Sequence, residues 1–273
     1  MFSWPLRQQA QTRFGEIAYD VRGQGSPVVL VHGTPSRSEI WRRIAPVLSE
    51  RRTVFAFDLL GFGESERHVE QDVSIRRHAE VLAELLGQWE LAAPAVVAHD
   101  IGGAVVLRAH INGGVPMSRL ALIDAVALRP WITPTTREMQ RNLGRYEPLP
   151  NAKLAAEIES HLVGATHRPL DPETFDVLFG QWEGAEGQAL YLRNVAQLDE
   201  RDTADFEPHL STMSTPTRLI WGEHDAWLDP SISTKLAELL PRADVVQIPD
   251  AGHFCMEDDP AAVAEALREF LNA

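Results

Sequence analysis

The sequence contains a single cysteine, Cys255, among its 273 residues. One cysteine excludes an intrachain disulfide and a metal site built from several cysteines. Basic residues are also scarce, since 25 Lys and Arg stand against 39 Asp and Glu and give a net charge of −14. Nucleic acid is therefore not expected as a partner, because its phosphates are bound largely by Lys and Arg.

Long hydrophobic runs are missing as well. The first residues pass from Met1 to Arg7 without the apolar segment of a signal peptide. No stretch of the chain approaches the ~18 apolar residues that a membrane span needs. We therefore expect no membrane partner and a cytoplasmic location.

What is present is the composition of a folded domain. Hydrophobic residues make up 44% of the chain and charged residues 23%. This mix is typical of globular proteins and excludes a mainly disordered chain. The length fits one large α/β domain, or such a core with an inserted lobe.

Short apolar, β-branched runs recur along the chain, and each ends at a polar residue or a glycine. Helix-like segments separate these runs, which predicts an α/β fold with a mostly parallel sheet covered on both faces. In such sheets the reactive side chains lie beyond the carboxyl ends of the strands. The expected strands are 28–31, 53–57, 95–98, 120–123, 217–221 and 243–248, and the clearest helices are 74–89, 103–111 and 232–240.

The alternation breaks in one long segment, where prolines separate short helical pieces and no buried-strand run occurs. We expect residues 126–207 to form a helical lobe inserted into a core made of residues 1–125 and 208–273. Aromatic residues of the lobe are candidates for lining a pocket that faces the sheet, although aromatics in a small helical lobe are also common core residues. These candidates are Trp131, Tyr146, Trp182 and Tyr191.

The sharpest local feature is a buried strand that turns abruptly into a helix at the segment from Ala98 to Gly103. A turn that displays a nucleophile between a strand and a helix normally reads G-x-S-x-G. Here Ala98 takes the first glycine position, Asp100 the serine position and Gly102 the last. The helix N-terminus stabilises a carboxylate at this tip and, later, a tetrahedral intermediate. Taken alone, Asp100 fits equally well as an ordinary helix cap.

Other strand ends favour chemistry at this turn. His32-Gly33-Thr34-Pro35 follows the first buried strand, Asp225 follows the late strand at 217–221, and His253 follows the strand at 243–248. This order of nucleophile, acid and histidine resembles the α/β-hydrolase fold family over nearly the whole chain. The aspartate at the turn is similar to the branch that contains haloalkane dehalogenases, haloacetate dehalogenases and epoxide hydrolases, in which the lobe is the family's cap.

The resemblance implies a role for each residue. Asp100 attacks a saturated carbon and forms an alkyl ester, because attack on an ordinary ester carbonyl would produce a reactive anhydride. His253 then activates the water that hydrolyses this ester, and Asp225 orients the histidine. The backbone amides of Thr34 and Ile101 form the oxyanion hole.

The resemblance also defines what else the site needs. Asp124, which ends another strand, is the alternative to Asp225 as the acid. No cofactor or metal is expected, since the site is complete without an ion and no His-Glu-x-x-His spacing occurs. The expected partners are a small-molecule substrate and water, and the sequence predicts no oligomeric state.

The pattern of leaving-group donors differs from each branch of the family. Haloalkane dehalogenases usually carry a tryptophan after the nucleophile and an asparagine after His-Gly, where this chain has Ile101 and Thr34. Haloacetate dehalogenases usually carry an arginine after the nucleophile. Epoxide hydrolases use two cap tyrosines, to which Tyr191, one residue out of register, and Tyr146 are the nearest matches.

The segments 32–42 and 58–61 are most similar to haloalkane dehalogenases, so a carbon–halogen bond is preferred over an epoxide as the substrate bond. Two further interpretations stay open. One is an ester or lactone hydrolase in which Asp100 acts as a base toward water. The other is a ligand-binding member of the fold that does not hydrolyse its ligand.

Overall fold

The computed structural model describes residues 4–149 and 151–272, so the parts of the expected core and lobe at 1–3, 150 and 273 lie outside the described residues. The described residues form an eight-stranded sheet in the order β1-β2-β4-β3-β5-β6-β7-β8. Its strands are β1 (Gln8–Thr12), β2 (Gly15–Arg22), β3 (Pro27–Val31), β4 (Thr53–Phe57), β5 (Ala95–Asp100), β6 (Arg119–Ala125), β7 (Thr217–Gly222) and β8 (Ala243–Ile248).

The six strands from β4 to β8 in this order are parallel to one another. At the edge of the sheet, β2 runs antiparallel to both of its neighbours, β1 and β4, and forms a hairpin with β1. The six parallel strands coincide with the six predicted apolar runs, and the α/β fold class is confirmed. The hairpin was not predicted. Its first strand reads Gln-Gln-Ala-Gln-Thr and buries only alternate residues, so it lacks the continuous apolar run that marks a central strand.

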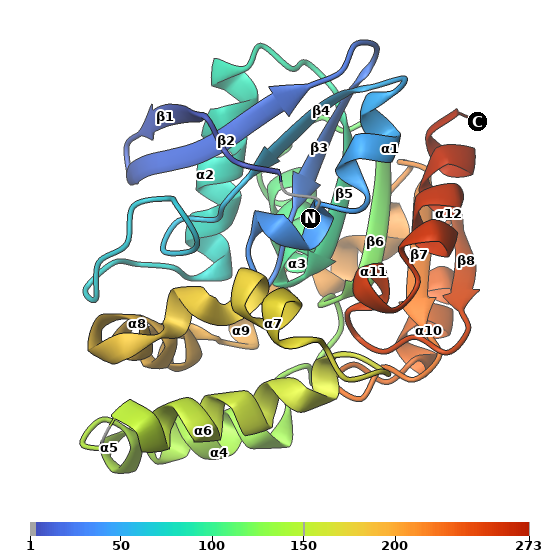
Figure 1. Ribbon diagram of the computed structural model, residues 1–273. Helices are drawn as coiled ribbons and strands as arrows, with labels where there is room; N and C mark the ends of the chain where they lie inside the picture. The colour runs from blue at the N-terminus through green and yellow to red at the C-terminus, as the bar shows by residue number, and fades with distance from the viewer. Residues whose placement is uncertain (1–3, 150, 273) are drawn as a thin grey trace.

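Helices cover both faces of this sheet. Figure 1 shows α1 and α12 in front of the strands, with α2 and α3 behind them. Helix α3 begins directly at the end of β5 and is buried along nearly its whole length. The core helices are η1 (Ser38–Trp41), α1 (Ala45–Ser49), α2 (Ile75–Gln88), α3 (Ile101–Ile111), α10 (Ser231–Leu239), α11 (Cys255–Asp258) and α12 (Pro260–Asn272), with η marking 3-10 helices.

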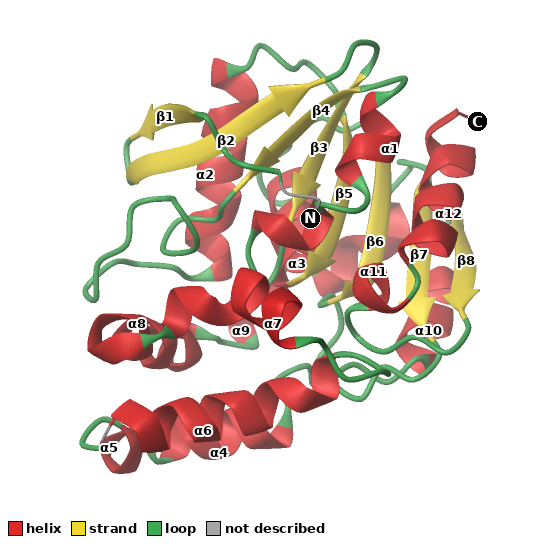
Figure 2. Cartoon of the chain, in the orientation of Figure 1, coloured by secondary structure: helices red, strands yellow, loops and turns green. Residues whose placement is uncertain are grey.

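Between β6 and β7 the described chain forms only helices and loops. These helices lie beyond the carboxyl ends of the parallel strands, where the arrowheads of Figure 2 point. One short helix, η4, continues past the predicted lobe boundary at residue 207. The helices of this cap are α4 (Pro134–Arg141), α5 (Leu143–Tyr146), α6 (Asn151–Leu162), η2 (Val163–Ala165), α7 (Pro172–Phe179), η3 (Gly180–Trp182), α8 (Gly184–Gln197), α9 (Arg201–Ala204) and η4 (Glu207–Thr212).

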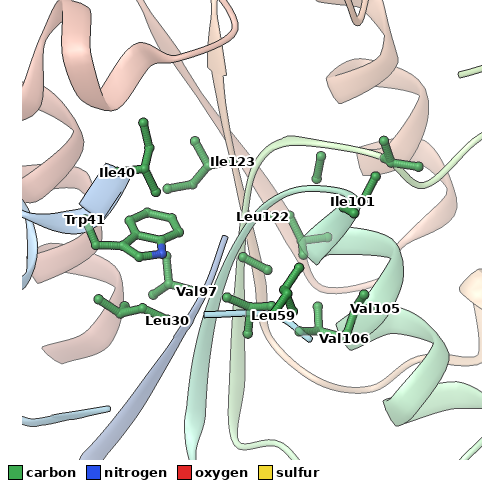
Figure 3. Close-up of a cluster of buried hydrophobic side chains, with 14 of the residues drawn as sticks. Leu30, Ile40, Trp41, Leu59, Val97, Ile101, Val105, Val106, Leu122 and Ile123 are labelled. Carbon is green, nitrogen blue, oxygen red and sulfur yellow. The ribbon is translucent and has the colours of Figure 1, made fainter. Parts of the chain in front are cut away.

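A continuous hydrophobic core fixes the strand ends in place. Figure 3 shows part of it, with Leu30, Val97 and Leu122 from three neighbouring strands and with Ile40 and Trp41 from η1. All five side chains are fully buried. Close packing of this kind resists rearrangement, so the loops that follow β3, β5, β7 and β8 start from rigid positions.

No helix in the described part of the chain combines the length and the apolar character that a membrane crossing requires.

Candidate active site

The turn between β5 and α3 holds Asp100 in an unusual backbone conformation, with φ 52° and ψ −126°. A positive φ is strained for a residue other than glycine, and such strain is concentrated at functional sites. The neighbouring chain comes very close to this turn. A β-carbon at position 102 would lie 2.6 Å from the carbonyl oxygen of His32, so only glycine fits there. The glycine of the motif therefore allows β3 and its loop to pass beside the displayed aspartate.

Asp100, His253 and Asp225 come together from three separate loops. The distance from His253 Nδ1 to Asp225 Oδ2 is 2.9 Å, and the distance from His253 Nε2 to Asp100 Oδ2 is 3.5 Å. The backbone amides of Trp227 and Leu228 donate hydrogen bonds of 2.8 and 2.9 Å to Asp225 Oδ1. Each carboxyl oxygen of Asp225 thus has a partner, and the histidine is held in one orientation.

Electrostatics favour a protonated histidine in this arrangement. Burial alone lowers the pKa of His253, but the carboxylates of Asp225 and Asp100 outweigh it and raise the pKa well above the ordinary value. Any change that removed the charge of Asp100 would therefore lower the pKa of His253 and increase the fraction of the histidine that is neutral.

The second oxygen of Asp100 lies against the loop after β3. The backbone amide of Thr34 donates a hydrogen bond of 2.7 Å to Asp100 Oδ1. Ile101 is the first residue of α3, so its amide belongs to the first turn, whose N–H groups have no partner within a helix. Of the two backbone groups predicted for the oxyanion hole, the amide of Thr34 thus contacts Asp100 across the fold, and that of Ile101 follows Asp100 in the chain.

Asp124 does not contact the catalytic histidine through a hydrogen bond. Its Oδ1 accepts one of 2.8 Å from the amide of Gly222. Burial, with a further contribution from the charge of Asp225, raises the pKa of Asp124 well above its ordinary value. The geometry therefore pairs His253 with Asp225, while Asp124 is a buried link between β6 and β7.

Two other buried histidines near the turn have structural contacts. His99 Nε2 lies 3.0 Å from the carbonyl oxygen of His253, and burial lowers the pKa of His99 well below its ordinary value. The ring of His32 joins two loops, since its Nδ1 lies 2.9 Å from the carbonyl oxygen of Gly33 and its Nε2 accepts from the amide of Leu59. Both rings hold backbone that positions the site.

A pocket enclosing about 550 Å³ of empty space, its mouth included, lies between Asp100 and the cap. Thr34, Pro35 and Ile101 line it on the core side, and its cap side comes mostly from residues 131–136 and from α8. Most of these side chains are apolar. Such a pocket excludes water from the carboxylate, which raises the strength of every electrostatic contact inside it.

The four aromatic residues predicted for the pocket divide into two groups. Trp131 and Tyr191 line it. Tyr146 and Trp182 do not line this pocket, so the structure gives the expectation for these two residues no support. The hydroxyl of Tyr146 donates to Glu138 Oε2 at 2.5 Å, and the indole of Trp182 donates to the carbonyl oxygen of Pro35 at 2.7 Å. Both residues are buried because they join cap helices to each other or to the core.

Several residues that line the pocket were not predicted, among them Trp227 and Asn194. Trp227 lines the pocket, and its ring centroid lies 4.8 Å from that of His253. Asn194 also lines the pocket, one turn after Tyr191 on α8. The helical spacing of three residues was the signal that could have found Asn194, because residues i and i+3 share a face. Its chemical type gave no such signal, since an asparagine in a helix is usually exposed.

One group of potential metal ligands lies outside this pocket. His167, His224 and Asp250 are exposed, and one ligand atom from each lies within 4.8 Å of the others. The rings of the two histidines are stacked with centroids 4.3 Å apart. None of the three lines the pocket.

Comparison with known proteins defines the family. The model of the alpha/beta hydrolase fold matches residues 26–260, and the chain belongs to that family. It is 29% identical to "Haloalkane dehalogenase 2" of Mycobacterium tuberculosis, in a match that covers 93% of this chain and 91% of the relative. It is 26% identical to "Putative hydrolase LipZ" of the same species, over 91% of this chain and 89% of that protein.

Solved structures agree on the fold. An alpha/beta hydrolase fold protein from Burkholderia ambifaria superposes with a TM-score of 0.94 at 35% identity, covering 98% of each chain. A haloalkane dehalogenase from Bradyrhizobium elkani has a TM-score of 0.81 at 22% identity, covering 97% of each chain. The family membership inferred from the sequence is confirmed, as is the similarity to haloalkane dehalogenases.

Proposed function

We propose that this protein is a hydrolase that displaces halide from a saturated carbon of a small apolar haloalkane. The observation that carries the proposal is the carboxylate of Asp100 at the strand-to-helix turn. One of its oxygens accepts the Thr34 amide, and the other lies 3.5 Å from His253 Nε2. This is the arrangement that a nucleophile needs if a histidine is to act after it has reacted.

In the first step, Asp100 Oδ2 forms a bond to the carbon while the carbon–halogen bond breaks, and the halide leaves with the bonding electron pair. The product on the enzyme is a neutral alkyl ester. An ester of this kind persists until an activated water molecule hydrolyses it, whereas the anhydride expected from an ordinary ester substrate is much more reactive. The identity of the nucleophile therefore favours saturated carbon.

In the second step, His253 Nε2 takes a proton from water as the water oxygen attacks the ester carbon of Asp100. The amides of Thr34 and Ile101 stabilise the negative charge on the former carbonyl oxygen. The intermediate then expels the alcohol, whose oxygen takes the proton from the histidine, and the carboxylic acid ionises to restore Asp100. Asp225 keeps the ring in position and balances its charge throughout.

Two observations favour halide over epoxide. Relatives that match most of the chain are named haloalkane dehalogenases. The second cap tyrosine that would support an epoxide hydrolase, Tyr146, is hydrogen-bonded to Glu138 and does not line the pocket.

An epoxide hydrolase is the second candidate because Tyr191 does line the pocket. Burial raises the pKa of its hydroxyl, which keeps the phenol protonated and able to protonate an oxygen leaving group. Ring opening by Asp100 would then give a hydroxyalkyl ester. This candidate makes a different adduct from the halide reaction, so one measurement separates the two.

The test is the intact mass of His253→Ala after incubation with 1-chlorobutane, 1-bromobutane, 1-iodobutane and 1,2-epoxybutane. This variant lacks the base for the second step and is expected to accumulate the ester. A mass gain equal to the substrate minus hydrogen halide supports halide displacement, and a gain equal to a whole epoxide supports ring opening. The control is the double variant Asp100→Asn/His253→Ala, which is expected to show no gain. A folded His253→Ala protein that forms no adduct contradicts the alkyl-ester mechanism.

A further inference from the structure

Asn194 is a buried amide whose donor has no partner within the described residues. Its side chain is 4% exposed and lines the pocket together with Asp100 and Tyr191. Asn194 Nδ2 has no hydrogen-bond partner although it is buried. A buried donor without a partner is costly, and folded proteins keep such groups rarely, most often where a ligand or water completes them.

The orientation of this amide follows from its neighbour. Arg193 Nε donates a hydrogen bond of 2.8 Å to Asn194 Oδ1. A guanidinium group has donors only, so it can face only the oxygen of the amide and not its nitrogen. Arg193 is itself held by the backbone, because its terminal nitrogens donate to the carbonyl oxygens of His68 and Gly61. The side-chain oxygen of Asn194 thus already accepts a hydrogen bond from Arg193. The NH₂ group of Asn194 is the part of the amide that can donate to a ligand.

Two indole donors near the pocket already have partners. The indole of Trp131 donates to Thr203 Oγ1 at 3.2 Å, and the indole of Trp182 donates to the Pro35 carbonyl. The residue after the nucleophile, Ile101, has no donor in its side chain. The side-chain amide of Asn194 therefore has an N–H available to donate to a negative leaving group, whereas these residues do not.

We propose that Asn194 Nδ2 donates the hydrogen bond that stabilises the departing halide. This inference rests on the proposed function, because it assigns a donor to the first step of that reaction. As Asp100 Oδ2 bonds to the carbon, the halide takes the electron pair of the broken bond, and the amide N–H donates to it. No proton is transferred. Asn194 is then a catalytic residue of the cap, contributed by α8.

The dependence on the halogen gives the proposal its signature. Chloride concentrates its charge in a smaller volume than bromide or iodide, so its departure gains most from a hydrogen bond. Removing the donor should slow reaction of the chloride most and that of the iodide least. A purely structural role for Asn194 would slow all three by the same factor.

The experiment measures the rate of ester formation by intact mass in the His253→Ala background, using 1-chlorobutane, 1-bromobutane and 1-iodobutane. Asn194→Asp retains an oxygen for Arg193 and replaces the donor with an acceptor, whereas Asn194→Leu removes the polar group at similar size. We expect each to slow the chloride about 10- to 100-fold, the bromide less, and the iodide by less than about 3-fold. The iodide rate also reports that the variant is folded.

Val195→Ala is the matched control, because Val195 lines the same pocket from the next position on α8 and has no polar group. It is expected to change the three rates by one common factor. The proposal would be overturned if both Asn194 variants slowed ester formation by the same factor for all three halides, or if both formed the ester at the rates of the His253→Ala protein. Failure of the parent His253→Ala protein to form any halide adduct would instead contradict the proposed function, so the two failures are distinguishable.

Discussion

The two walls of the pocket are built in different ways. On the core wall, Asp100, His253 and Asp225 stand at the ends of rigid strands, and backbone amides of Thr34, Trp227 and Leu228 hold the two carboxylates. On the cap wall, the side chains come from short helices, and several of their polar groups hold the cap together. In the proposed reaction, the core wall holds the nucleophile and its base, while the cap wall limits the volume of the pocket and contributes the proposed donor to the leaving group.

The charged groups of the core wall match the family pattern, whereas the leaving-group donors depart from it, both at Thr34 and Ile101 of the core wall and in the cap. A carboxylate or histidine at a strand end is held by backbone groups that any sequence supplies. A donor in the cap depends on side chains that also serve packing, as the hydrogen bond from Trp182 to the Pro35 carbonyl shows. We expect substitutions on the core wall to remove activity and substitutions on the cap wall to change selectivity or stability.

The largest effect is expected for Asp100→Ala, which removes the nucleophile. Halide release should fall by about 10⁴-fold or more, since removing a nucleophile leaves only the residual catalysis of the binding site. Steady-state halide release from bromoalkanes measures it, with thermal unfolding as the check on folding. Activity near that of the parent protein would contradict the core-wall assignment.

The next effect separates two buried acids of the same wall. Asp225→Asn should lower kcat by roughly 10³- to 10⁴-fold, because the histidine loses the carboxylate that orients it and balances its charge. Asp124→Asn should change kcat less than about 3-fold, because the carboxylate that contacts His253 is that of Asp225 and an amide oxygen at position 124 can still accept from Gly222. Measuring both variants under identical conditions tests the comparison, and the reverse order of effects would assign the acid to Asp124.

A smaller, graded effect is expected from pH. The second step needs neutral His253, whose pKa in the alkyl ester is raised by the charge of Asp225 and lowered by burial, since Asp100 has then lost its charge. Below that pKa, the rate of ester hydrolysis should fall about tenfold for each pH unit as the base is protonated, and above it the rate should level off. Ester formation needs only ionised Asp100, so it should vary little over the same range. Rapid-quench measurement of both steps checks this, and parallel pH profiles would contradict it.

The smallest effect is expected on the cap side, for Trp182→Phe. This change removes the hydrogen bond from the indole to the carbonyl oxygen of Pro35. The same oxygen still accepts a hydrogen bond of 3.1 Å from Gln181 Nε2. The free energy of unfolding should fall by about 1 kcal/mol, and kcat should change only a few-fold. Denaturant unfolding measures the first quantity. Tyr146→Phe, which removes a bond inside the cap, is the control and should leave kcat unchanged.

The fold was predictable where burial leaves a continuous signal. The runs at 28–31 and 95–98 are apolar at every position because both faces of those strands are covered. The β1–β2 hairpin was not predicted, since an edge strand such as Gln8–Thr12 buries only one face. The family resemblance added the order of Asp100, Asp225 and His253 along the chain. In the structure, the ring nitrogens of His253 lie 2.9 Å from Asp225 and 3.5 Å from Asp100.

The cap was predictable only as a helical insertion. Four aromatic residues were equal candidates for the pocket, yet only Trp131 and Tyr191 line it. Composition could not separate them from Tyr146 and Trp182, because all four are buried and differ only in what they face. Which face of a short helix meets the pocket depends on how that helix packs on others.

By itself, the sequence determined the parallel sheet and the identity of the groups at its carboxyl edge. The physical reason is that parallel strands end at the same edge, so residues far apart in the chain meet wherever the strands stop. Only the tertiary structure decided which polar groups are free to act. Arg193 commits the oxygen of Asn194, and Gly222 holds Asp124. Hydrogen-bond partners of this kind come from elements that pattern and spacing along the chain do not relate.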